Sequence, residues 1–146
     1  MRVDFCSKRM AEEAEPDPSV AVISITNYKD PSANLKPGWL AVLRVQFDDI
    51  DPGRNISPFL KADMLSVYRP MTEEQAEEIL GFADVMVGSF NEATGILVHC
   101  EMGVSRSAAV AKFLRERYGL PEDEPDERFH NPHVYRLLKQ AAEKTP

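Results

Sequence analysis

A short apolar strand that runs directly into a tight loop and then a helix constrains this chain more than any other feature. Ile96 to Val98 is an apolar run of strand length, and His99 and Cys100 follow it at once. After Gly103, the run from Ser107 to Leu114 is predicted to form a helix, and its small first-turn residues suit close packing under the loop. A strand, a loop and a helix in this order predict an α/β layer in which helices cover a sheet.

Two further strands are predicted nearer the N-terminus. Val20 to Thr26 is rich in β-branched residues and bounded by polar ones, which is typical of a buried strand. Trp39 to Phe47 shows partial alternation of apolar and polar residues, and the proline-containing segment Asn27 to Gly38 indicates a loop between the two strands. We therefore expect a central sheet of four to five strands with helices on both faces. The loop after Val98 is expected at the carboxyl edge of that sheet.

Three more helices are predicted outside this motif. Arg9 to Glu15 is expected to form a short helix. Thr72 begins a longer one, because Thr72 and Gln75 match a capping box, and Asn91 marks its end. The last helix begins at Asn131, an N-cap residue followed by proline in the first helical position.

Length predicts one globular domain over residues 1–146, because domains usually contain about 100–150 residues. Within it, residues 48–70 are the least regular part and are assigned no element, and residues 121–127 are expected to form a surface linker. No apolar run approaches the roughly 20 residues that span a membrane. The N-terminus lacks the apolar core of a signal peptide, so a cytoplasmic location is expected.

Charge and cysteine content exclude several classes of function. The formal net charge of −7 argues against nucleic acid or a membrane surface as the partner, since such binders need basic patches. Cys6 and Cys100 are not expected to form a stable disulfide in a reducing cytosol, and Cys6 fits a packed strand residue better than a second reactive thiol. His130 and His133 lack the spacing of metal ligands and are expected to be surface or capping residues. The sequence does not indicate an oligomeric state.

Cys100 and Arg106 stand six positions apart around a loop whose physical properties favour phosphate binding. A loop wrapped at the N-terminus of a helix turns its backbone N–H groups inward and makes an anion nest that the helix dipole reinforces. Gly103 permits a tight backbone turn, and Arg106 can grip two phosphate oxygens with its planar fork. The same amides stabilise a Cys100 thiolate beneath the phosphate. The residues expected to surround the phosphate are Glu101, Met102, Gly103, Val104, Ser105 and Arg106.

The loop resembles the His-Cys-x5-Arg-Ser/Thr signature of the protein tyrosine phosphatase superfamily, and most of all its small dual-specificity branch, in the form His99-Cys100-x-x-Gly103-x-Ser105-Arg106-Ser107. The resemblance implies a dual-specificity phosphatase-like fold and a two-step reaction. In that reaction Cys100 attacks phosphorus, and water then hydrolyses the cysteinyl-phosphate. The resemblance also implies that Arg106 stabilises the transferring oxygens, that His99 supports the thiolate, and that Ser107 helps Cys100 leave. No metal or organic cofactor is required.

The family also uses an aspartic general acid on a separate loop that follows an earlier strand. Here the resemblance points to the acidic cluster after the second predicted strand, which contains Asp48, Asp49 and Asp51. We favour Asp49, with Asp51 second, because Phe-Asp-Asp resembles the family's strand-end pattern and that of some small prokaryotic relatives. Asp49 lies 51 positions before Cys100, farther than is usual in the branch, and an insertion over about residues 55–70 would account for this.

The expected substrate is a phosphorylated protein or a small phosphomonoester, with phosphotyrosine first and phosphoserine or phosphothreonine as extensions. A non-protein phosphate (a phosphoinositide, an inositol phosphate or an RNA 5′-phosphate) is the alternative within the enzyme class. Glu101, Met102 and Val104 add no positive charge to the loop, which favours protein or aryl phosphates. A catalytically silent phosphate-binding module is the alternative from another class, although such proteins usually lose the cysteine, arginine or acid.

Simpler interpretations of single residues also stay open at this point. Cys100 can be an inert buried cysteine, and Ser107 an ordinary first-turn serine that bonds to the backbone. His99 can be structural rather than a group that tunes the thiol. Any one of the aspartates can be a loop or capping residue.

Overall fold

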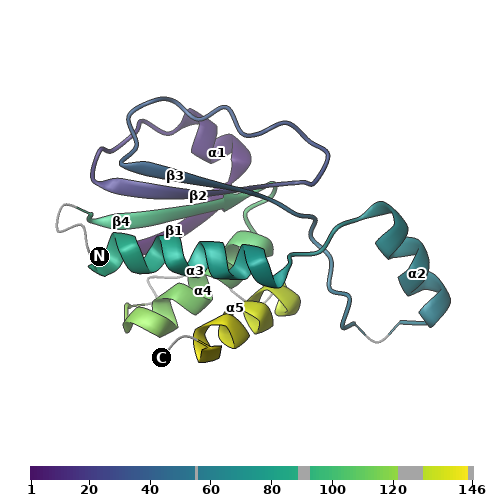
Figure 1. Ribbon diagram of the computed structural model, residues 1–146. Coiled ribbons are helices and arrows are strands. Elements are labelled where there is room, and N and C mark those ends of the chain that lie inside the picture. The colour runs from purple at the N-terminus through teal and green to yellow at the C-terminus, as the bar shows by residue number, and fades with distance from the viewer. Residues whose placement is uncertain (55, 89–92, 122–129, 145–146) are drawn as a thin grey trace.

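Four parallel strands form the sheet of this protein, described here from a computed structural model over residues 1–54, 56–88, 93–121 and 130–144 (Figure 1). The strands are β1 (Arg2–Ser7), β2 (Val20–Thr26), β3 (Ala41–Gln46) and β4 (Gly95–Cys100), in the spatial order β1-β4-β2-β3. Each neighbouring pair is parallel. β2 is buried over almost its whole length, which explains its unbroken run of apolar residues. The expected α/β fold is confirmed.

Helices cover the two faces of the sheet unequally. α3 (Glu73–Gly88), α4 (Arg106–Tyr118) and α5 (Pro132–Lys144) lie on one face, while the short α1 (Lys8–Glu13) and the segment between β2 and β3 lie on the other (Figure 1). The core lies mainly between the sheet and the three longer helices. Its largest fully buried side chains include Phe47, Ile23, Ile25, Ile79, Leu114 and Leu138.

The helix starts follow the signals read from the sequence. The backbone N–H of Gln75 donates to Thr72 Oγ1 at 3.2 Å, and the N–H of Thr72 donates to Gln75 Oε1 at 3.0 Å, so the predicted capping box is present. Asn131 Oδ1 accepts from the N–H of His133 at 2.9 Å and caps α5, as expected. α3 ends at Gly88, and Asn91, its predicted end, lies outside the described residues.

Two elements were not predicted as such: in β1 only Cys6 was expected to be a strand residue, and no element was expected at α2. β1 pairs in parallel with β4 at the edge of the sheet, but its mixture of charged and apolar residues gave no clear strand pattern. α2 (Pro58–Val67) lies within residues 48–70, where no element was assigned. Ser57 caps α2, because its Oγ accepts from the N–H of Leu60 at 3.2 Å, and Pro58 stands at the first position. The predicted linker over residues 121–127 lies almost wholly outside the described residues.

Among the described helices, none combines the length and the apolar character needed to cross a bilayer. The strand expected over residues 96–98 extends to Cys100, so the cysteine is the last residue of β4. α4 then begins at Arg106. The five residues between them, 101–105, are called the cysteine loop below.

Candidate active site

The cysteine loop crosses the carboxyl edge of the sheet and is held there by backbone hydrogen bonds. The N–H of Lys8 donates to the carbonyl of Glu101 at 3.2 Å, which fastens the loop to the end of β1. Gly103 has φ +71°, a conformation that side chains disfavour. A Cβ atom there would lie 2.4 Å from both the carbonyl carbon of Cys6 and the nitrogen of Ser7. Only glycine therefore fits where the loop crosses β1.

The Cys100 thiol is buried and surrounded by donors. Only 2% of the residue is exposed, and its Sγ lies 3.1 Å from Ser107 Oγ and 3.3 Å from the N–H of Gly103, which donates to it. Burial raises the pKa of Cys100. The pKa is lowered by the Ser107 hydroxyl and amide, the charge of Arg106 and the Gly103 amide, and together these outweigh burial. The net result is a pKa below the ordinary value of a cysteine.

Arg106 lies beside this thiol and keeps one donor unused. The residue is 3% exposed, and its Nη1 donates to the carbonyl of Phe47 at 2.6 Å, at the end of β3. Its Nε is buried and has no hydrogen-bond partner within the described part of the chain. An orphaned buried donor typically costs about 1–3 kcal/mol, so an anion that accepts from Nε stabilises this arrangement.

His99 lies beneath the end of β4 and is fully buried. Its Nε2 lies 2.6 Å from Ser24 Oγ on β2, and its Nδ1 lies 3.4 Å from the carbonyl oxygen of Cys100. Burial lowers the pKa of His99 below the ordinary range, so the ring is neutral at pH 7. These hydrogen bonds hold the strand end rather than the sulfur, which favours an indirect role for the histidine.

Asp48 and Asp51 are each occupied by the protein's own donors. Asp48 accepts from the backbone N–H of Tyr28 at 3.1 Å and from that of Arg69 at 2.8 Å. Asp51 accepts from the N–H of Gly53 at 3.0 Å and pairs with Arg136 at 3.1 Å. Both carboxylates therefore fix the local backbone.

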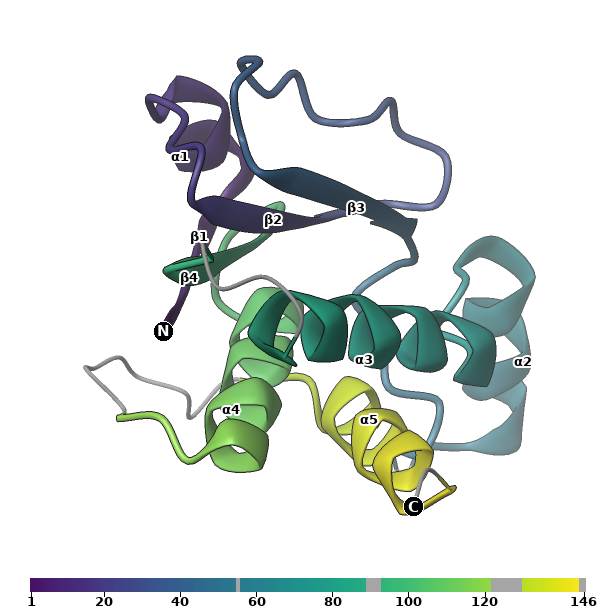
Figure 2. The ribbon, with the colours of Figure 1, turned by 60° about the vertical axis from the view of Figure 1, so that its left-hand side comes forward.

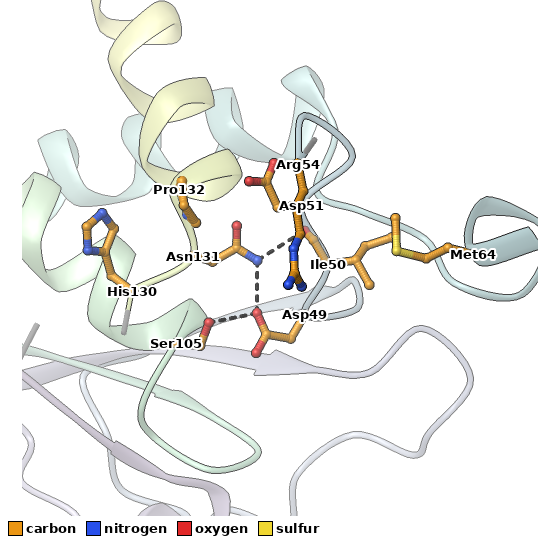
Figure 3. Close-up of a pocket in the computed structure, with 9 residues that line it drawn as sticks. All are labelled: Asp49, Ile50, Asp51, Arg54, Met64, Ser105, His130, Asn131 and Pro132. Atoms are coloured by element: carbon orange, nitrogen blue, oxygen red, sulfur yellow. Dashed lines mark hydrogen bonds between the residues drawn. The ribbon is translucent and has the colours of Figure 1, made fainter. Parts of the chain in front are cut away.

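Asp49 instead reaches the cysteine loop. Its Oδ1 accepts from Ser105 Oγ at 2.8 Å and from Asn131 Nδ2 at 2.9 Å, as the close-up in Figure 3 shows. No hydrogen bond of a described residue reaches Oδ2. The structure thus brings Asp49, and not Asp48 or Asp51, to the loop that holds Cys100.

Asn131 connects three parts of this site and was predicted only as a helix cap. Its Nδ2 also donates to the carbonyl of Ile50 at 3.1 Å, and its backbone N–H donates to the carbonyl of Ser105 at 3.1 Å. The Asn-Pro pair predicted the cap correctly. The contact with Asp49 spans 82 positions, and nothing in the local sequence predicts it.

A cavity of about 490 Å³ opens beside Asp49, on the side of α5 (Figure 3). Cys100 does not line it, so the cavity flanks the thiol rather than covering it. Its lining residues are Asp49, Ile50, Asp51, Arg54, Met64, Ser105, His130, Asn131 and Pro132. His133, expected at the surface or in a cap, has its Nε2 2.9 Å from the carbonyl oxygen of Met71.

Three residues of the cysteine loop have exposed side chains. Glu101, Met102 and Val104 are exposed, whereas Cys100 beneath them is buried. Cys6 is the packed strand residue that was expected, since burial, with Cys100 and Asp4 nearby, raises its pKa to about 11. Of the two cysteines, Cys100 is the one whose pKa is lowered.

No protein-family model and no curated protein matches this chain. Several solved structures are similar to it. A crystal structure of human DUSP28 is 24% identical, with a TM-score of 0.42, and the match covers 97% of this chain and 92% of that one. A mouse putative dual specificity phosphatase complexed with zinc tungstate is 18% identical, with a TM-score of 0.42, and the match covers 96% and 81% of the two chains.

A third similar structure is that of the human tyrosine phosphatase-like serine/threonine/tyrosine-interacting protein. It is 21% identical, with a TM-score of 0.37, and the match covers 86% of this chain and 77% of that one. Identities below 25% with TM-scores below 0.5 say nothing about what this chain catalyses.

Proposed function

We propose that this chain is a cysteine-dependent phosphomonoester hydrolase, with phosphotyrosine as its first substrate and phosphoserine or phosphothreonine as extensions. One observation supports this most directly: a buried thiol of lowered pKa lies beside a buried arginine whose Nε has no partner among the described residues. A thiolate is a nucleophile, and an unpartnered guanidinium N–H can donate a charge-assisted hydrogen bond to an anion. A phosphoryl group satisfies both, because it offers oxygens to Arg106 and an electrophilic centre to Cys100.

In the first step, Cys100 Sγ forms a bond to phosphorus while the bond from phosphorus to the ester oxygen breaks. The leaving oxygen takes a proton from Asp49, which becomes a carboxylate, and the product is a cysteinyl-phosphate. Arg106 stabilises the charge that develops on the phosphoryl oxygens. Both donors to Asp49 go to Oδ1, so we assign the proton that is transferred to Oδ2.

In the second step, water attacks phosphorus and gives its proton to Asp49, and the bond between sulfur and phosphorus breaks. Sulfur leaves as a thiolate and phosphate is released. The Ser107 hydroxyl, 3.1 Å from Cys100 Sγ, is placed to donate to that thiolate. The first step consumes the Cys100 thiolate and the Asp49 proton, and the second step restores both. The cycle therefore needs only water and the ester.

Hydrolysis of p-nitrophenyl phosphate in the presence of EDTA tests this proposal. The native chain is expected to turn over, and Cys100→Ser is expected to lose activity by several orders of magnitude. Turnover that survives this substitution would contradict the cysteine mechanism. Binding of vanadate without turnover by the native chain would favour a silent phosphate-binding module instead.

A further inference from the structure

The segment between β3 and α3 carries Asp49 and runs out from the sheet before it returns. Figures 1 and 2 show α2, in the middle of this segment, lying apart from the sheet. The segment is anchored in the core at its two ends, by Phe47 and Met71, which are 0% and 2% exposed. None of the ten residues of α2 is buried, so packing of α2 contributes little to holding the segment in place. The position of Asp49 therefore depends on polar contacts near the two anchors.

Asp48 joins the two ends of this segment to each other and to β2. Its backbone N–H donates to the carbonyl of Arg69 at 2.7 Å, and its Oδ2 accepts from the N–H of Arg69 at 2.8 Å. Its Oδ1 accepts at 3.1 Å from the N–H of Tyr28, which lies just beyond the end of β2. The Arg69 guanidinium lies 5.4 Å from the centre of the Tyr28 ring, so the two donor segments also contact each other. We call Asp48, Tyr28 and Arg69 the clasp.

The clasp needs both oxygens of a carboxylate. Each oxygen of Asp48 accepts from the backbone of a different segment, and an asparagine in its place would offer only one acceptor oxygen. Hydrogen bonds from N–H groups to an ionised carboxylate are roughly twice as strong as neutral ones, so this one side chain can hold two segments together.

The clasp and the other contacts of Asp49 hold different parts of that residue. Ser105 and Asn131 donate only to the Asp49 side chain, at Oδ1. Asp48 is joined to Asp49 by a peptide bond, so fixing Asp48 fixes the backbone from which the Asp49 carboxyl projects. Among the described residues, no hydrogen bond connects the clasp to Cys100, to the cysteine loop or to Ser107.

We infer that Asp48 is a positioning residue, which holds the backbone of Asp49 where the Asp49 carboxyl can protonate the leaving oxygen of the ester. This inference rests on the proposed hydrolase function. A displacement of about 1 Å in a catalytic group can lower a rate about a hundredfold. Loss of the clasp should therefore weaken proton transfer from Asp49 while the thiol keeps its surroundings.

The test measures how hydrolysis depends on the leaving group. Phenyl phosphate has a leaving oxygen that needs a proton, whereas p-nitrophenyl phosphate has one that needs little protonation. The measured quantity is the ratio of kcat/KM for phenyl phosphate to kcat/KM for p-nitrophenyl phosphate, which does not depend on the amount of folded enzyme. Asp48→Ala is expected to lower this ratio about tenfold. Asp48→Asn keeps one acceptor oxygen and is expected to lower the ratio less.

Two further variants separate positioning from stability. Asp17→Ala is the matched control, because Asp17 also accepts from a backbone N–H, that of Ser19 at 2.9 Å, but precedes β2 and so lies at the amino edge of the sheet. It is expected to leave the ratio unchanged even where it lowers the urea midpoint. The double variant Asp48→Ala/Asp49→Asn is expected to show the ratio of Asp49→Asn alone, because the clasp acts through Asp49.

The outcomes distinguish this inference from the hydrolase proposal. Turnover with an unchanged ratio in Asp48→Ala would overturn the inference and leave the hydrolase proposal standing. A further tenfold loss in the double variant would also overturn it, because Asp48 would then act independently of Asp49. Equal losses in Asp48→Asn and Asp48→Ala, with none in Asp49→Asn, would make Asp48 the proton donor itself. A native chain that hydrolyses neither ester would overturn both proposals.

Discussion

At the scale of single residues, the site depends on which polar atoms have no hydrogen-bond partner among the described residues of the protein. Asp48 accepts from backbone donors with both oxygens, and Asp51 accepts from Gly53 and Arg136 with Oδ1. Asp49 keeps Oδ2, and Arg106 keeps Nε. Arg106 Nε is buried, and most buried polar groups in a folded chain are paired, so its lack of a partner among the described residues is unusual. Asp49 is an exposed residue. In the proposed reaction, Asp49 Oδ2 and Arg106 Nε are the atoms that meet the phosphate ester.

Replacing Asp49 by asparagine is expected to slow hydrolysis by removing the proton donor. General acid catalysis typically contributes about 10²–10⁴-fold, so kcat on phenyl phosphate should fall at least a hundredfold. The loss should be smaller on p-nitrophenyl phosphate, because its leaving group needs little protonation. Asp51→Asn is the control, since Asp51 holds Gly53 and Arg136 instead. An equal loss on both substrates would argue against Asp49 as the acid.

The two cysteines are expected to differ in their reaction with iodoacetamide as pH rises. The pKa of Cys100 lies below its ordinary value, so more of it is thiolate at a given pH than of an ordinary cysteine, and this fraction falls as pH falls through the lowered pKa. The pKa of Cys6 is raised to about 11, so Cys6 stays a thiol. Mass spectrometry should therefore find label on Cys100 at pH 7. In Ser107→Ala the midpoint of Cys100 labelling should move to higher pH, and an unmoved midpoint would deny the serine that role.

At the scale of elements, the path of the cysteine loop depends on the glycine at position 103. Gly103→Ala is expected to displace the cysteine loop, because φ is +71° and the added Cβ would meet backbone atoms of Cys6 and Ser7 at 2.4 Å. Activity should fall at least tenfold, with Cys100 labelled only at higher pH, since its Gly103 donor moves. Gly81→Ala in α3 is the matched control, because a Cβ there meets nothing within 4 Å. It should raise stability by about 0.5–1 kcal/mol in urea unfolding and leave activity unchanged.

Elements with a strong local signal were predicted, and those without one were missed. β2, β3, β4 and α3 have apolar patterns or caps that can be read from neighbouring residues. β1 is stabilised by pairing with β4, which lies more than ninety positions away in the sequence. The mixture of charged and apolar residues in β1 does not predict a strand. α2 buries no residue, so it has no core-facing periodicity, and only its Ser-Pro start was readable.

At the scale of the whole molecule, the site is assembled from segments that the sequence cannot place together. Asp49 follows β3, Cys100 ends β4, and Asn131 begins α5. The local motif predicted the thiol, the arginine and the glycine, because all lie within one loop. The contacts that single out Asp49 among the three aspartates join it to Ser105, 56 positions away, and to Asn131, 82 positions away. The local sequence predicts neither contact. Parallel strands explain why these segments meet, since their carboxyl ends share one edge of the sheet.

Asn131→Asp separates the structural part of this residue from its effect on Asp49. An aspartate still accepts from the N–H of His133 and caps α5, so the urea midpoint should change little. It cannot donate to Asp49, and its negative charge favours the protonated form of that neighbour. The alkaline limb of the kcat profile should therefore move to higher pH, with lower kcat from the lost alignment. Asn131→Ala loses cap and donor together and should cost about 1 kcal/mol of stability. If Asn131→Asp leaves the pH profile unchanged while Asn131→Ala lowers stability, Asn131 is a cap alone, and the network around Asp49 does not position the acid.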